Sequence, residues 1–189
     1  MKALLFIVLL TMLMQAGPKK DPEVNRIEGY CADIEAMMSR SMSSVRIFME
    51  VADKSKKEPE RWREFITENE RQAASSQGKF PATAYVAVRN GHAVAADFMF
   101  EGDPSRWTVS YCFREDGTLA RIQAALSIES QDLSIGKMQF FSPTGKVIFE
   151  TNEYYDLQRQ QQKPAPKSST APPIPIYRTI RELPFYKSL

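Results

Sequence analysis

Between Thr83 and Tyr155 the chain alternates polar and apolar residues, and short turn sequences separate the alternating segments. An Asn-Gly pair at residues 90–91 lies between two such segments, and this arrangement is a strong local signal for a β-hairpin. The whole pattern predicts six strands, at residues 83–89, 92–101, 106–114, 118–129, 137–142 and 146–155. Because the connections are short, we expect the strands to form an antiparallel meander.

One face of this predicted sheet, called the aromatic face below, carries large apolar side chains. On the second and third strands its members are Val94, Ala96, Phe98, Phe100, Trp107, Val109, Tyr111 and Phe113. A sheet face of this kind needs a second layer of structure to cover it. We therefore expect the aromatic face to point toward the helices predicted from the N-terminal part of the chain.

Residues 21–51 carry apolar side chains three and four positions apart, which is the spacing of an amphipathic helix. Asp21 suits the N-cap and Pro22 suits the first turn. A second helix is predicted from Pro59 to Ala74, and the two would form an antiparallel hairpin. The predicted fold is α+β, with this N-terminal helical hairpin packed on one face of the six-stranded antiparallel meander. The residues expected in their shared core are Ile34, Val45, Phe98, Val109, Tyr111 and Ile122.

An apolar block extends from Ala3 to Met14 after the positively charged Lys2, and small residues follow it. These are the three parts of a secretory signal peptide. We expect residues 1–16 to be a signal peptide cleaved after Ala16, which exports the chain to the periplasm or the extracellular medium and leaves no transmembrane span. Because Met14 is a poor residue three places before the cut, an uncleaved N-terminal membrane anchor is the alternative.

Composition and charge divide the rest of the chain. An α+β domain is expected at residues 17–156, a Pro/Gln-rich linker at 157–175 and a basic, aromatic C-terminal segment at 176–189. Residues 17–156 hold 18 Lys and Arg against 22 Asp and Glu, a net charge of −4. Residues 157–189 hold 6 against 1, a net charge of +5. Such a tail suits docking on its own domain, on an acidic partner protein, or on an anionic membrane or polymer.

The C-terminal segment has strand periodicity between Ile174 and Ile180. Pro175 lacks an N–H group and would confine such a strand to a sheet edge. We expect residues 176–180 to pair with an edge or to lie in a groove of the domain; a free tail that engages a partner is the alternative. The residues expected to make contacts, with the last two as anchors, are Tyr177, Arg178, Phe185 and Tyr186.

Candidate ligand-binding residues lie on the other face of the predicted sheet. Asp97 is expected to share this outer face with arginines that suit an anionic ligand, namely Arg89, Arg106, Arg114 and Arg121. A solvated face with scattered charges is the alternative. The single histidine, His92, has no orienting carboxylate on its own face of the strand, so no catalytic residue is assigned. One histidine and two cysteines are too few ligands for a zinc or iron–sulfur site, and we expect no metal and no cofactor.

Cys31 and Cys112 are the only cysteines, and two cysteines in an exported chain usually form a disulfide. Strand alternation, however, places Cys112 opposite the aromatic face, whereas Cys31 lies on the apolar side of the first predicted helix. If that helix covers the aromatic face, the sheet separates the two sulfurs, and a disulfide needs Cα atoms within about 7 Å. The pairing therefore stays open and depends on which face the helix covers.

The missing catalytic motifs, the predicted export and the C-terminal segment together favour a small exported interaction or ligand-binding module that is non-catalytic. Its expected partner is an envelope protein or a small ligand; a net charge of +2 gives no reason to expect nucleic acid. The alternative is an envelope hydrolase or isomerase with a carboxylate/arginine site between helices and sheet. A cleft with converging titratable groups would favour the enzyme, and a filled core with flat outer faces would favour the module.

Overall fold

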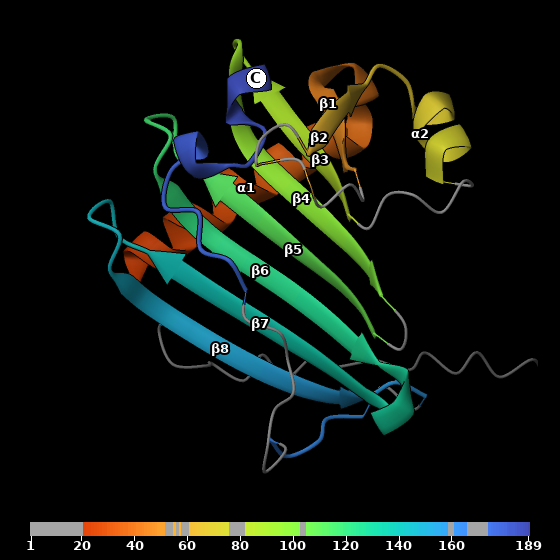
Figure 1. The fold of residues 1–189 in the computed structure, drawn as a ribbon. Helices are drawn as coiled ribbons and strands as arrows, with labels where there is room; N and C mark the ends of the chain where they lie inside the picture. Colours follow the sequence, from red (N-terminus) through yellow and green to blue (C-terminus); the bar gives the residue numbers. More distant parts are fainter. Residues whose placement is uncertain are drawn as a thin grey trace, which may run out of the picture.

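An antiparallel sheet of eight strands is the main element of the described structure (Figure 1). The structure is a computed structural model that describes residues 21–51, 55, 57, 61–75, 82–102, 105–158, 161–165 and 174–189. The strands are β1 (Val45–Glu50), β2 (Trp62–Phe65), β3 (Ala82–Arg89), β4 (His92–Gly102), β5 (Ser105–Phe113), β6 (Leu119–Ile128), β7 (Leu133–Phe141) and β8 (Val147–Asp156). The α-helices are α1 (Pro22–Arg40) and α2 (Glu68–Ser75), and the 3-10 turns are η1 (Met42–Ser44), η2 (Glu129–Gln131), η3 (Ile180–Glu182) and η4 (Tyr186–Ser188). The order across the sheet is β2-β1-β3-β4-β5-β6-β7-β8.

The hairpin between β3 and β4 confirms the prediction from the Asn-Gly pair. Arg89 pairs with His92, and the two residues between them, Asn90 and Gly91, have φ angles of 53° and 77°. A two-residue turn with two positive φ angles matches the twist of its flanking strands. The antiparallel pairing from β3 to β8 is thus confirmed, but β1 and β2 extend the sheet beyond the predicted six strands.

The predicted α+β fold with a helical hairpin on a six-stranded meander is wrong, because the described chain is mostly β. The end of the first predicted helix forms β1, and the early part of the second forms β2. Helix α1 ends at Arg40, Ser41 caps it, and the chain enters β1 at Val45. Val45 and Met49 are four residues apart, a spacing that fits a strand of period 2 as well as a helix. The β-branched Val45 and Ile47 favour the strand, since their side chains pack well on a pleated surface.

The second predicted helix also gives way to a strand. Trp62 lies opposite Glu50 where β2 pairs with β1 at the edge of the sheet. Helix α2 begins only after Thr67, where the Glu70 N–H donates to the Thr67 hydroxyl at 3.2 Å and the Glu70 carboxylate accepts from the Thr67 N–H at 3.3 Å. This reciprocal pair is a capping box. It starts the helix at Glu68 and leaves the preceding residues to the sheet.

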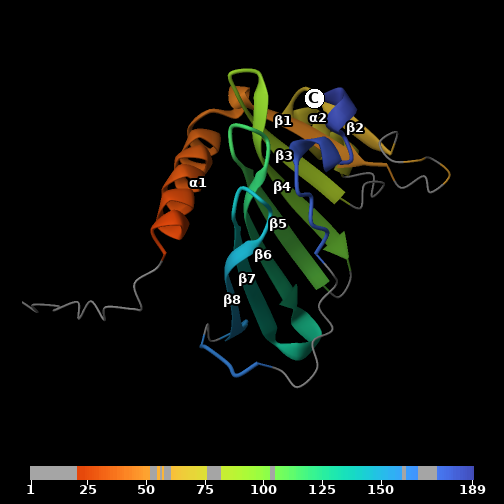
Figure 2. The same cartoon turned by 90° about the vertical axis from the view of Figure 1, so that its left-hand side faces the viewer.

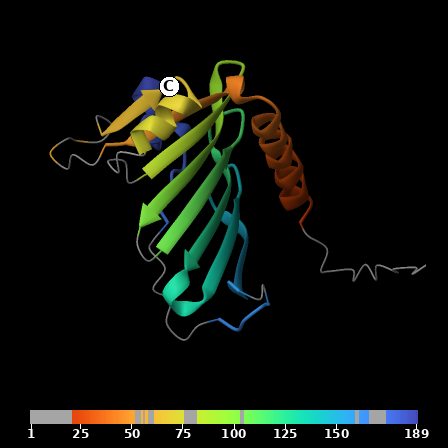
Figure 3. The ribbon, with the colours of Figure 1, turned by 90° about the vertical axis from the view of Figure 1, so that its right-hand side faces the viewer.

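Different layers cover the two faces of the sheet, as the views along it show (Figures 2 and 3). Helix α1 lies on one face and residues 174–189 lie on the other. The buried helix residues Val24, Ile27, Cys31 and Ile34 pack in one cluster with Ala87, Val94, Ala95, Cys112, Ala120 and Phe140. The helix therefore covers the face opposite the aromatic residues, and the expectation that helices cover the aromatic face is wrong. Val94, which strand alternation placed on the aromatic face, packs with the helix instead, because the β3–β4 register shifts at this point.

The C-terminal segment covers the aromatic face instead. Leu183 and Phe185 are 3% and 0% exposed, and they share a cluster with Phe48, Trp62, Phe98, Val109, Tyr111, Phe113 and Ile122. Among the predicted core residues, burial is confirmed for Ile34, Phe98, Val109, Tyr111 and Ile122. Val45 is only partly buried. These residues form two cores, one on each face, rather than the single helix–sheet core that we expected.

The C-terminal segment meets the sheet at the turn between β5 and β6, not along an edge. Thr179 forms one isolated bridge with Thr118, and the chain then turns into η3 at Ile180. Because β5 and β6 lie in the middle of the strand order, the predicted edge pairing is not formed. The C-terminal segment instead docks on the face of its own domain, which was the other arrangement that we expected.

Several expectations concern residues that the structure leaves undescribed. The predicted signal peptide at residues 1–16 lies outside the described residues, as do residues 159–160 and 166–173 of the predicted linker. Within the described part of the chain, no helix combines the length and the hydropathy that crossing a membrane requires.

Candidate functional site

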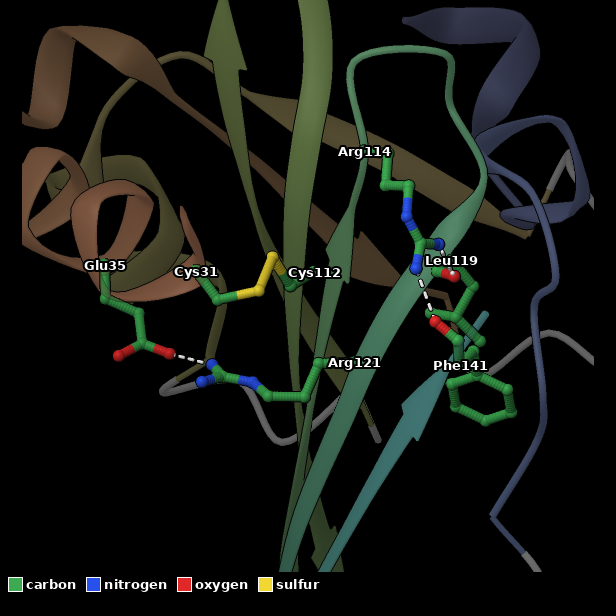
Figure 4. Close-up of a disulfide and its surroundings, with 7 residues drawn as sticks. All are labelled: Cys31, Glu35, Cys112, Arg114, Leu119, Arg121 and Phe141. Atoms are coloured by element: carbon green, nitrogen blue, oxygen red, sulfur yellow. Dashed lines mark hydrogen bonds and ion pairs between the residues drawn. A yellow bond between two sulfur atoms is a disulfide. The ribbon is translucent and has the colours of Figure 1, made fainter. Parts of the chain in front are cut away.

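A disulfide joins helix α1 to strand β5 (Figure 4). It connects Cys31 and Cys112, whose Cα atoms are 6.0 Å apart. Strand alternation placed Cys112 correctly, opposite the aromatic face. The argument against the disulfide failed because it assigned the helix to the wrong face. With α1 on the Cys112 face, the two cysteines meet inside the same buried cluster.

The predicted arginines are used in separate interactions. Arg114 donates from Nη1 to the Leu119 carbonyl at 2.6 Å and from Nη2 to the Phe141 carbonyl, so it ties the start of β6 to the end of β7 (Figure 4). Burial lowers the pKa of Arg114 below its ordinary value. Arg89 is the last residue of β3 and takes no part in these two hydrogen bonds. The side chain of Arg106 lies outside the described residues.

Arg121 is the predicted arginine that lies beside Asp97. Its side chain is 8% exposed and forms an ion pair with Glu35 of helix α1 (Figure 4). The Nε–H of Arg121 is buried without a hydrogen-bond partner. Both Arg121 and Glu35 also act electrostatically on Asp97. The structure thus brings Asp97 and Arg121 together, as predicted, and adds Glu35, which was not predicted.

Asp97 and Glu35 border a hollow of about 310 Å³ between α1 and the sheet, called the Asp97 cleft below. The residues that line it are Glu35, Met38 and Ser39 from α1, and Asp97, Thr108, Ser110, Gln123 and Ala125 from the sheet. Asp97 lies opposite Ser110, and Ser110 lies opposite Gln123, so three neighbouring strands present one polar row. On the sheet side the cleft is lined by polar side chains and by the small Ala125.

The surroundings of Asp97 in the cleft shift the pKa of its carboxyl group. Burial raises the pKa of this carboxyl above its ordinary value of 3.8. A hydrogen bond from Ser110 and the positive charge of Arg121 lower the pKa, whereas the nearby Glu35 raises it. Since the net shift is upward, the ionised form of Asp97 is poorly compensated where it lies.

Glu35 reaches the cleft because of the disulfide. It follows Cys31 by four residues and so lies one helical turn further along the same side of α1. On the sheet, Arg121 lies directly opposite Cys112. Joining the two cysteines therefore brings Glu35 and Arg121 together. If the disulfide had been assumed, the four-residue spacing of Cys31 and Glu35 would have predicted the Glu35–Arg121 ion pair from the sequence.

The residues predicted to bind a partner divide into two groups. Phe185 is fully buried, and the Tyr177 ring lies 5.9 Å from the Phe98 ring and 5.3 Å from the Tyr111 ring, centroid to centroid. Arg178 donates to the Gly145 carbonyl at 3.1 Å. Tyr186 is 39% exposed. Three of the four thus contact the protein's own domain.

Two other hollows lie near the β5–β6 turn. One of about 690 Å³ involves the C-terminal segment, and one of about 420 Å³ lies between Arg114 and the start of α1, lined also by Arg26 and Tyr30. Among the described residues, no three His, Cys, Asp or Glu side chains are grouped closely enough to hold a metal ion. Comparison with protein-family models, with curated proteins and with solved structures finds no match.

Proposed function

We propose that this protein is a small exported, non-catalytic module that binds a small hydroxylated amine in the Asp97 cleft. The observation that carries the proposal is the partly buried Asp97 carboxylate, whose pKa burial raises. A buried carboxylate is unfavourable unless an opposite charge or sufficient hydrogen bonds compensate it. A cationic ligand would supply that compensation.

The charges around the cleft favour a cation over an anion. Arg121 is already neutralised by its ion pair with Glu35, so its charge is not free for an anionic ligand. Asp97 has a hydrogen bond from Ser110 and no ion pair within the described part of the chain. An ammonium group placed beside Asp97 would be attracted by its carboxylate, which has no such partner among the described residues.

The remaining lining specifies the rest of the ligand. Thr108 and Ser110 offer hydroxyl groups and Gln123 offers an amide, and these groups both donate and accept hydrogen bonds. A volume of about 310 Å³ is at the small end of the range for ligand pockets. These features together suit an amine that carries several hydroxyl groups, such as an amino sugar.

Isothermal titration of the purified mature protein with glucosamine tests the proposal, with glucose and N-acetylglucosamine as neutral analogues. We expect glucosamine to bind and the neutral analogues to bind at least about tenfold more weakly, because they lack the charge that pairs with Asp97. Asp97→Asn should remove this preference. Glu153→Gln, on the exposed outer part of β8, is the matched control and should leave binding unchanged. Equal binding of all three sugars to the unmodified protein would overturn the proposal.

An envelope hydrolase or isomerase is the second candidate function, and one observation favours it. Two carboxylates, Glu35 and Asp97, and the guanidinium of Arg121 converge between α1 and the sheet, which is where such a site was expected. A carboxyl group with a raised pKa retains its proton to higher pH and suits a general acid. Incubating the protein with glycosides or sugar epimers and following the products by NMR distinguishes the candidates. Turnover that Asp97→Asn abolishes would establish the enzyme, and binding without turnover would support the module.

A further inference from the structure

The hollow of about 690 Å³ near the C-terminus is assembled from three separate parts of the chain. We call it the turn groove. The β3–β4 turn contributes Gly91 and His92, the β5–β6 turn contributes residues 115–117, and the C-terminal segment contributes its lining residues between Thr179 and Leu189. The turn groove is more than twice as large as the Asp97 cleft and lies at the ends of strands rather than beside α1.

The wall formed by the C-terminal segment is held in place by main-chain hydrogen bonds. Leu119 donates its N–H to the Arg178 carbonyl at 2.9 Å, and Ile180 donates its N–H to the Gly117 carbonyl at 3.0 Å. Gly117 has a φ of 81°, and a Cβ atom there would lie 3.4 Å from Ile180 Cδ1. The positive φ and this close approach both favour glycine at the turn. The turn groove is therefore a preformed feature of the docked segment.

Opposite charges line the turn groove from different elements. Glu115 and Asp116 line it from the β5–β6 turn, whereas Arg181 and Lys187 line it from the C-terminal segment. In the described part of the chain, no ion pair joins these acids to these bases. Hydrogen bonds from the Thr118 hydroxyl and N–H to Asp116 lower the pKa of that carboxyl, so it is ionised at neutral pH. The two charged walls are thus available to a ligand that carries both charges.

Apolar side chains also line the turn groove. Val88 and Ala93 come from the β3–β4 hairpin, and Ile180 and Leu189 come from the C-terminal segment. Apolar surface in a pocket favours a ligand with an apolar body, and a few charged groups fix its orientation. A volume of about 690 Å³ exceeds what a single amino acid fills and lies well within the range for larger ligands.

We propose that the turn groove binds a short zwitterionic peptide of two or three residues with an apolar side chain. Its ammonium group pairs with Glu115 and Asp116, and its carboxylate pairs with Arg181 and Lys187. An extended peptide of this length separates its terminal charges by about 7–10 Å, which suits charges on two walls of one groove. The proposal does not depend on the Asp97 cleft, which lies beside α1 and shares no lining residue with the turn groove.

Because the C-terminal segment is one wall, ligand binding also stabilises its docked position. A ligand that binds only the docked arrangement shifts the equilibrium toward that arrangement. The amide of Ile180 reports this directly, since its N–H is hydrogen-bonded to Gly117 only when the segment is docked. We expect hydrogen exchange at Ile180 to slow when the peptide is added.

Isothermal titration of the mature protein with the tripeptide Ala-Phe-Ala tests the proposal. The N-acetylated and C-amidated forms of the same tripeptide serve as probes that each lack one charge. We expect the free tripeptide to bind, and we expect each blocked form to bind at least about tenfold more weakly. Equal binding of a blocked form and the free peptide, or no binding of the free peptide, would overturn the proposal.

Substitutions of the charged lining residues test which of them pair with the carboxylate and the ammonium group of the peptide. In Arg181→Gln combined with Lys187→Gln, the free and C-amidated peptides should bind equally, because the carboxylate has lost its partners. In Glu115→Gln the penalty for N-acetylation should shrink instead. A purely structural effect would weaken all three peptides together and would contradict the assignment. Lys146→Gln, at the exposed β7–β8 turn, is the control for the loss of a positive charge. Asp97→Asn should retain peptide binding, which separates this site from the one in the proposed function.

Discussion

Phe185 stacks face to face on Phe48, with ring centroids 4.4 Å apart and ring planes 6° from parallel. Phe48 belongs to β1, near the edge of the sheet, and Phe185 belongs to the last part of the chain. Both side chains are fully buried. The C-terminal segment is therefore part of the hydrophobic core and not an appended tail. Substitutions in it should consequently change the stability of the whole protein.

Replacing Phe185 by Ala should destabilise the protein strongly. The side chain is fully buried among aromatic rings, and removing such a side chain leaves a cavity that costs about 3–5 kcal/mol. Urea unfolding followed by fluorescence measures the change. Tyr186→Ala is the matched control, and since Tyr186 is 39% exposed, it should lose much less. Equal, small losses for the two variants would mean that the segment is not docked in solution.

Replacing both Cys31 and Cys112 by Ser should lower the free energy of unfolding by about 2–4 kcal/mol, since the disulfide limits the freedom of the unfolded chain. Thermal unfolding with and without a reducing agent measures the same effect in the unmodified protein. The double variant should also lose glucosamine binding, because the disulfide positions Glu35 beside Arg121. A double variant with unchanged stability would show that the two cysteines do not pair.

Asp97→Asn should stabilise the protein at neutral pH. The folded state raises the pKa of Asp97 above its ordinary value of 3.8, so the folded protein binds this proton more tightly than the unfolded chain does. The contribution of Asp97 to stability is therefore fully present below about pH 4 and is lost as the pH rises through the higher pKa of the folded state. The Asn side chain carries no charge and avoids this loss. Melting temperatures of the two proteins should differ at pH 7 and converge near pH 4; a difference that is constant across this range would contradict the assignment.

The N-terminus of the exported product tests the predicted signal peptide. Cleavage after Ala16 yields a mature chain that begins at Gly17 and lacks the charge of Lys2. Mass spectrometry of the protein recovered from the periplasm or the medium measures this directly. Recovery of a chain that still begins at Met1 from the membrane fraction would replace cleavage by an N-terminal anchor.

Local signals predicted those elements that depend on neighbouring residues alone. The Asn90-Gly91 turn placed the β3–β4 hairpin to within one residue, because few residues accept two positive φ angles in succession. The four-residue spacing of Val45 and Met49 failed, because it suits both a helix and a strand. The Thr67–Glu70 capping box was visible in the sequence. It would have placed the start of the second predicted helix at Glu68 instead of Pro59.

The candidate site was only partly predictable because it depends on contacts between distant segments. Strand alternation placed Asp97 and Arg121 on one face, and this assignment was right. Nothing in the alternation showed which face α1 covers, so Glu35 was missed and the Cys31–Cys112 disulfide stayed open. Similarly, Arg114 looked like a ligand-binding residue, whereas it donates to two main-chain carbonyl groups. Those carbonyl groups become its neighbours only in the folded sheet.

The covering of the aromatic face by residues near the end of the chain has a consequence for biosynthesis. When β8 leaves the ribosome, all the described strands are present, and the cysteines of α1 and β5 have already emerged. The aromatic face still lacks its cover, because Phe185 follows β8 in the sequence. A nascent chain thus completes one side of the sheet early and holds the other side open until Phe185 has been synthesised. During that interval the exposed aromatic residues are a binding surface for chaperones, and a chain cut short before Phe185 keeps that surface permanently.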